Sequence, residues 1–126
     1  MVPSIRVPDL QAALDFYTGK LGFIVIRGTP GEGHVAVARG EERVMLESGT
    51  GGFYAPGYND AIRGRLGSAS PNALYLEEPQ LEQYCDELQK AGVEIVDPLA
   101  DRPWGQAEFT VADGDGNWLT FWRRTS

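Results

Sequence analysis

The sequence predicts an α+β protein built from two βαβββ modules, at about residues 1–48 and 71–124. Three observations predict this fold class. A pattern of one strand, one helix and further strands occurs twice. A long segment over 49–70, rich in glycine and without periodicity, separates the two rounds. The apolar fraction of 42% and the charged fraction of 23% are those of one folded domain over residues 1–126.

The first module is read from residue spacing. Asp9 is the expected N-cap of a helix that ends at Gly22, and a strand precedes it. The apolar stripe of this helix consists of Leu10, Ala13, Leu14, Tyr17 and Leu21. The strands are expected at residues 3–8, 23–27, 34–39 and 43–48, with turns at 29–33 and 40–42.

The second module repeats this order. A helix with an apolar stripe of Leu81, Tyr84, Cys85 and Leu88 ends at Gly92. Its strands are expected at residues 72–77, 93–96, 106–112 and 118–123, and a tight turn at 113–117. The only cysteine, Cys85, lies on the helix stripe, so we expect a buried structural thiol and no internal disulfide.

Four motifs are shared with one known superfamily. They are Ile5-Arg6-Val7-Pro8-Asp9-Leu10, Phe16-Tyr17, Leu21-Gly22-Phe23 and the turn Asp113-Gly114-Asp115-Gly116-Asn117, which is like a DPDGN turn with glycine in place of proline. On these residues nearly the whole chain resembles the vicinal oxygen chelate superfamily of glyoxalases, ring-cleaving dioxygenases and bleomycin-resistance proteins. The resemblance implies curved mixed sheets that form a cup with the helices outside. It does not imply one function, because this fold hosts several chemistries.

Enzymes of that superfamily hold a divalent metal through four cup-facing side chains, usually His, Gln or Glu. The resemblance places the four positions at Val2, Met45, Pro71 and Thr120. Only Thr120 offers an oxygen, and a hydroxyl is a poor ligand for such ions. A shift of one residue brings in Glu47 or Asn72 without completing a set. His34 is expected away from these positions and without an acidic partner, so we expect no metal, no cofactor and no catalytic residue.

The resemblance is closest in type to the metal-free bleomycin-resistance proteins, which sequester an antibiotic without modifying it. Val2-Pro3 is similar to the proline-bearing arm through which those proteins exchange an N-terminal strand, which implies a homodimer with Pro3 in the dimer arm. Pro103-Trp104-Gly105 is similar to the segment whose tryptophan stacks on the flat bithiazole of the drug. The phenylalanine that completes the stack falls near Glu32 or His34 here, so the chain departs from the pattern for bleomycin itself.

Strand alternation indicates which side chains line the expected cup. If Thr120 faces the cup, so do Trp118 and Trp122, while Leu119 and Phe121 face the helices. The predicted ligand-binding residues are Trp104, Trp118, Thr120, Trp122, Tyr75, Glu47, Met45, Glu108, Arg6 and, in the long loop, Tyr54. Aromatic faces beside carboxylates favour a flat cation. The alternative is that the tryptophans pack in the core or at a dimer interface and that the glutamates are solvated strand ends.

These observations favour a binding protein: a cytoplasmic homodimer that sequesters a flat, cationic, bleomycin-like antibiotic or related metabolite in an aromatic, acidic cup at the dimer interface. A net charge of −7 argues against nucleic acid, and no stretch predicts a membrane span or a signal peptide. Two alternatives stay open. One is an enzyme, either metal-dependent with a misaligned site or a metal-free isomerase, that uses Glu47 as ligand or base with His34. The other is a scaffold or chaperone-like protein of a biosynthetic pathway.

Overall fold

The computed structural model divides into two units, Met1–Ser70 and Pro71–Ser126, which are described separately. It describes residues 2–48, 57, 60 and 73–125. The long loop predicted over 49–70, including Tyr54, therefore lies outside the described residues apart from positions 57 and 60. Among the described residues, no helix has the length and apolar character needed to cross a bilayer.

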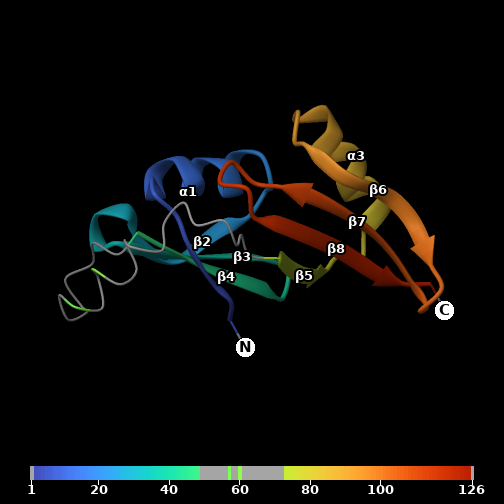
Figure 1. Ribbon diagram of the computed structural model, residues 1–126, viewed down its shortest axis with the longest axis horizontal. Helices are drawn as coiled ribbons and strands as arrows, with labels where there is room; N and C mark the ends of the chain where they lie inside the picture. The colour runs from blue at the N-terminus through green and yellow to red at the C-terminus, as the bar shows by residue number, and fades with distance from the viewer. Residues whose placement is uncertain (1, 49–56, 58–59, 61–72, 126) are drawn as a thin grey trace. The chain divides into compact units, whose positions relative to one another are not determined.

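The first unit is a four-stranded mixed sheet with a helix packed on one face (Figure 1). Its elements are β1 (Ser4–Arg6), α1 (Leu10–Gly19), β2 (Ile24–Thr29), the short 3-10 helix η1 (Pro30–Glu32), β3 (His34–Arg39) and β4 (Glu42–Glu47). The strand order is β1-β4-β3-β2, with β1 parallel to β4 and the other neighbours antiparallel. This is the predicted βαβββ module, although β2 continues to Thr29 and η1 occupies the predicted turn.

Local signals explain why α1 begins and ends where it does. The Asp9 side chain accepts a hydrogen bond from the backbone N–H of Ala12 at 3.0 Å, so the predicted N-cap is confirmed. Gly22 has a φ of 75°, a conformation that favours glycine after a helix. The helix buries Leu10 and Tyr17 against the sheet. The sheet residues fully buried in this core are Ile5, Val35, Val37, Val44 and Leu46.

The second unit repeats the connectivity with a longer edge strand. Its elements are β5 (Ala73–Glu77), α3 (Leu81–Lys90), β6 (Ile95–Arg102), β7 (Gln106–Ala112) and β8 (Trp118–Arg124). The strand order is β5-β8-β7-β6, with β5 parallel to β8 (Figure 1). The prediction that β6 spans only 93–96 is wrong. It runs on through Pro98 because it is an edge strand, where a missing N–H removes no ladder bond, and its pairing with β7 is irregular between Ile95 and Ala100.

Aromatic rings fill the core of the second unit. Tyr84 on α3 meets Phe121 edge-on, with ring centroids 4.9 Å apart, and Phe109 lies 5.6 Å from Phe121. All four predicted stripe residues of α3 are buried, including Cys85, where burial raises the pKa of the thiol. Two βαβββ modules of the α+β class are thus confirmed, while their union in one domain over 1–126 remains a prediction.

The turn from β7 to β8 is held by one buried carboxylate. Asp113 Oδ1 accepts from the backbone N–H groups of Asp115 and Asn117, at 2.9 and 2.8 Å. Asp113 Oδ2 accepts from the Asn117 side-chain amide at 2.9 Å. Gly116 has a φ of 82°, which the turn requires and glycine adopts without strain. The tight turn predicted at 113–117 is confirmed, and it fixes the register of the two strands that carry most of the candidate site.

Candidate functional site

In the second unit, the sheet face opposite α3 is called here the helix-free face. Phe121 is buried on the α3 side, against Tyr84. Alternation along β8 therefore points Trp118, Thr120 and Trp122 to the helix-free face, as predicted. The register pairs Trp118 with Ala112, Thr120 with Thr110 and Tyr75, Trp122 with Glu108, and Arg124 with Gln106. Directly paired residues share a face, so these side chains form one surface.

The aromatic side chains of this face are not core residues of the structure. Tyr75 is 64% exposed and Trp118 is 49% exposed, while Trp122 is half-buried. The alternative of packing in the core is therefore wrong for Trp118, while packing at a dimer interface stays open. Exposed indole and phenol rings beside one another provide flat surfaces on which a planar molecule can stack. Their role as ligand contacts stays a prediction.

A buried carboxylate on the same face pairs in register with Trp122. Glu108 is only 6% exposed, and its Oε1 lies 3.6 Å from Nε of Arg102, which also binds Asp97. Its other oxygen, Oε2, is buried and accepts no hydrogen bond from the described residues. A buried carboxylate oxygen without a donor is costly, so it indicates a place where a donor on a ligand would be stabilised. The hydroxyls of Thr110 and Thr120 satisfy each other at 2.7 Å and provide no such place.

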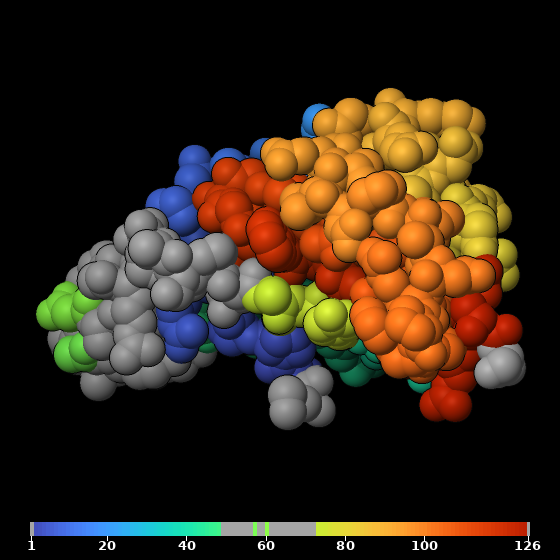
Figure 2. Space-filling view, turned by 45° about the vertical axis from the view of Figure 1, so that its right-hand side comes forward, coloured from blue at the N-terminus to red at the C-terminus, as the bar shows by residue number. Residues whose placement is uncertain are grey.

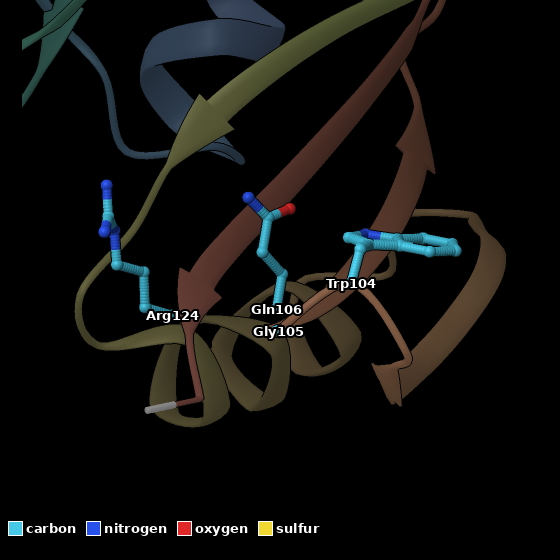
Figure 3. A pocket seen from close by; sticks show the side chains of 4 residues that line it. All are labelled: Trp104, Gly105, Gln106 and Arg124. Carbon is cyan, nitrogen blue, oxygen red and sulfur yellow. The ribbon is translucent and has the colours of Figure 1, made fainter.

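A pocket of about 300 Å³ lies at the end of the same sheet. It is lined by Trp104, Gly105, Gln106 and Arg124. In Figure 3 the Gln106 and Arg124 side chains extend in the same direction, and the Trp104 indole lies on the far side of Gln106 from Arg124. The Trp104 side chain is 62% exposed on the turn between β6 and β7. Figure 2 shows this turn in orange beside the red end of β8.

The predicted site residues of the first unit lie on the sheet face opposite α1. Glu47 on β4 is 5% exposed and pairs in register with Arg6 on β1 and with His34 on β3. The prediction that His34 has no acidic partner is therefore wrong, because strand pairing brings it next to Glu47. Met45 is on the same face, and its N–H donates to the Pro3 carbonyl at 2.8 Å. The role of Pro3 in a dimer arm stays a prediction.

The residues at the expected metal positions do not fit a divalent ion. Val2 is exposed and has no donor side chain, Met45 offers a thioether, and the Thr120 hydroxyl is bonded to Thr110. Pro71 lies outside the described residues. Within the described ranges no group of three or more His, Cys, Asp or Glu side chains could hold a metal ion.

Sequence reasoning missed two residues of the pocket, Gln106 and Arg124. Gln106 lies two residues before Glu108 on β7, and Arg124 lies two residues after Trp122 on β8. Side-chain alternation alone could therefore have placed both on the helix-free face. What alternation could not give is their closeness to Trp104. That depends on the turn closing over the end of β8, where the Thr125 N–H donates to the Gly105 carbonyl at 3.0 Å.

The sequence and the structure were compared with known protein families and solved structures. The model of the Glyoxalase/Bleomycin resistance protein/Dioxygenase superfamily matches residues 2–121. The structure is similar to that of TioX from Micromonospora sp. ML1, with a TM-score of 0.78 and 22% identity over 98% of this chain and 97% of that chain, a likeness that shows the fold alone. No curated protein sequence matches at a significant level.

Two further solved structures have slightly higher identity. UcmS2 has a TM-score of 0.72 and 26% identity, over 99% of this chain and 96% of that chain. A glyoxalase/bleomycin resistance protein from Streptomyces sp. CB03234 has a TM-score of 0.72 and 25% identity, over 97% of each chain. These chains match this one over nearly their full lengths, so the resemblance covers both modules.

Proposed function

The chain belongs to the Glyoxalase/Bleomycin resistance protein/Dioxygenase superfamily, and on this premise we propose that it is a non-catalytic protein that binds a flat, cationic small molecule. The ligand class we propose is a bleomycin-like antibiotic or a related metabolite, held by sequestration. The protein acts as a cytoplasmic homodimer, with the ligand in an aromatic, acidic cup at the dimer interface.

One observation carries the proposal: a sheet face with aromatic side chains also holds a buried carboxylate oxygen that has no donor among the described residues. Trp122 is the direct cross-strand neighbour of Glu108, and Tyr75 and Trp118 lie on the same face. A planar cation satisfies both features, because its ring stacks on the indoles while its N–H groups donate to the carboxylate. The acidic net charge of −7 attracts the same class of ligand.

The test is calorimetric titration of the protein with bleomycin and with flat cationic dyes such as proflavine. We expect binding that Trp122→Ala and Glu108→Gln each weaken at least tenfold, about 1.4 kcal/mol. We expect the same loss for Trp104→Ala if the bound ring reaches the turn. Glu94→Gln, at an exposed glutamate of the same unit, is the matched control and leaves the affinity unchanged. Absence of heat with every cation of the panel would refute the proposal.

A second function is favoured by one observation in the first unit. The register places His34 and Arg6 on either side of Glu47. Histidine and glutamate serve acid–base chemistry, and arginine adds a fixed positive charge. We propose as the alternative an enzyme of the glyoxalase or dioxygenase type in which Glu47 is a base or ligand and His34 its partner. Elemental analysis of protein purified without chelator separates the two: stoichiometric nickel, iron, manganese or zinc that Glu47→Gln removes would favour the enzyme.

A further inference from the structure

We propose that the pocket lined by Trp104, Gln106 and Arg124 binds the carboxylate of a flat aromatic acid. Arg124 pairs with the carboxylate, Gln106 donates a hydrogen bond to it, and the ring of the acid lies against the Trp104 indole. The inference rests on the proposed small-molecule role of the chain, but not on a cation at Glu108. The group bound at this end of the sheet is an anion, whereas the group proposed at Glu108 is a cation.

The sheet itself positions the polar groups of the pocket. Gln106 on β7 pairs in register with Arg102 on β6 and with Arg124 on β8, so a guanidinium side chain lies on each side of the amide. The turn preceding Gln106 is closed by a hydrogen bond from the Gly105 N–H to the Arg102 carbonyl at 3.3 Å. Gly105 has a φ of 82°, as a three-residue hairpin turn requires at its last position. These bonds hold Trp104 at a fixed place beside the pocket.

Arg124 is the basic side chain of this region that remains available to an anion. Arg102 is bound to Asp97 and lies near Glu108, and Arg123 is bound to Glu82. Within the described residues no carboxylate lies within ion-pair distance of Arg124. An exposed guanidinium in a concave site can bind a carboxylate through two parallel N–H bonds, a geometry that lysine cannot supply.

The size and lining of the pocket define the class of ligand. A volume of about 300 Å³ is at the lower end of small-molecule sites, which suits one or two fused rings. The lining is mainly polar: the amide and guanidinium supply donors, Trp104 adds an indole at one side, and no lining residue is acidic. Glu108 lies two residues further along β7, about 7 Å away. An acid in the pocket therefore leaves the Glu108 carboxylate free for a separate cationic group.

The test uses 2-naphthoate as the probe, with 2-naphthylmethanol and 2-naphthylmethylammonium as the neutral and cationic isosteres. We expect calorimetry to detect 2-naphthoate binding, at least fivefold tighter than that of either isostere. We also expect the indole N–H resonance of Trp104, assigned with Trp104→Phe, to shift on titration. Arg124→Gln should weaken 2-naphthoate binding at least fivefold, whereas Arg27→Gln, at an exposed arginine of the first unit, should not.

The outcomes separate this inference from the proposed function. The proposed acid site is overturned if Arg124→Gln lowers the affinity for 2-naphthoate less than fivefold, or if the wild-type protein does not bind 2-naphthoate. This holds whether or not proflavine binds. Binding of 2-naphthoate that depends on Arg124 supports the pocket even if every cation fails to bind. Arg124 is exposed near the end of β8, so its replacement leaves the fold intact, and the unfolding midpoint of each variant checks this.

Discussion

The two modules share one connectivity but present different chemistry on the sheet faces opposite their helices. In the first module this face carries Arg6, Met45 and Glu47 and, among the described residues, no Phe, Tyr or Trp. In the second module the equivalent face carries Tyr75, Trp118, Trp122 and the buried carboxylate of Glu108. Repetition of the fold therefore did not duplicate the proposed binding surface. The second module supplies the stacking surfaces, and the first supplies a polar set around one buried carboxylate.

The edge strands of the two modules differ in the same way. β2 exposes Ile24, Val25 and Ile26, three apolar side chains in a row on the edge of its sheet. β6 carries Pro98 and Asp101 instead, residues that prevent pairing with another strand. The edge beside the Trp104 pocket is thus protected from association, while the edge of the first module is not.

Different local interactions stabilise the two modules. In the first, the Asp9 side chain caps α1, and a two-residue turn around Gly40 joins β3 to β4. In the second, the N-cap Gln80 of α3 makes no side-chain capping bond, and the Asp113 network holds the turn before β8. The predictions below test this contrast, from the largest expected effect to the smallest.

Asp113→Ala should destabilise the protein by about 3 kcal/mol, because three N–H groups lose a charged acceptor in a buried turn. The measurement is urea unfolding followed by circular dichroism. The control is Glu41→Ala, in the turn of the first module, which should change the free energy of unfolding by no more than about 0.5 kcal/mol. Equal effects of the two substitutions would contradict the contrast between the turns.

Asp9→Ala should lower the free energy of unfolding by about 1 kcal/mol, because it removes the side-chain acceptor at the start of α1. Gln80→Asp should raise it by about 0.5 kcal/mol, because it supplies the capping acceptor that α3 lacks. Thermal unfolding of both variants measures the expected decrease in stability for Asp9→Ala and the expected increase for Gln80→Asp. A loss of stability in Gln80→Asp would show that α3 is capped by other means.

The smallest effect concerns the ion pair between Glu82 on α3 and Arg123 on β8. The hydrogen bond from Arg123 lowers the pKa of Glu82 in the folded state. The ion pair therefore contributes fully to stability above the pKa of Glu82 in the unfolded chain, about 4.3. This contribution is lost as the pH falls through the lower pKa of Glu82 in the folded protein. Glu82→Gln should be less stable than wild type at pH 7 and equally stable near pH 2.

The parts of the fold that follow from local patterns could be predicted from the sequence. The Asp9 cap, the stripe of α3 and the inward parity of Trp122 and Glu108 all depend on residues close together in the chain. The full length of β6 could not, because Pro98 and irregular pairing hide its alternation. The pairing of His34 with Glu47 was expected only under the enzyme alternative and not from strand patterns, since register between strands is set by the whole sheet and not by the sequence of one strand.

The candidate site divides along the same line. Which residues of β7 and β8 share a face follows from the alternation of side chains along a strand, and this alternation could be predicted from the sequence. The joining of Trp104, Gln106 and Arg124 in one pocket could not be, because it depends on a turn that folds against a strand end about 20 residues later in the chain. Glutamine and arginine are also ordinary surface residues, so their types alone give no functional signal.

The hydrogen bond from the Thr125 N–H to the Gly105 carbonyl has a practical consequence for anyone purifying this protein. It ties the last residues of the described chain to the rim of the Trp104 pocket. An affinity tag fused after Ser126 would begin within two residues of that rim, where a run of histidines could compete with an added ligand. Titrations are best made with the tag at the N-terminus or removed by protease beforehand.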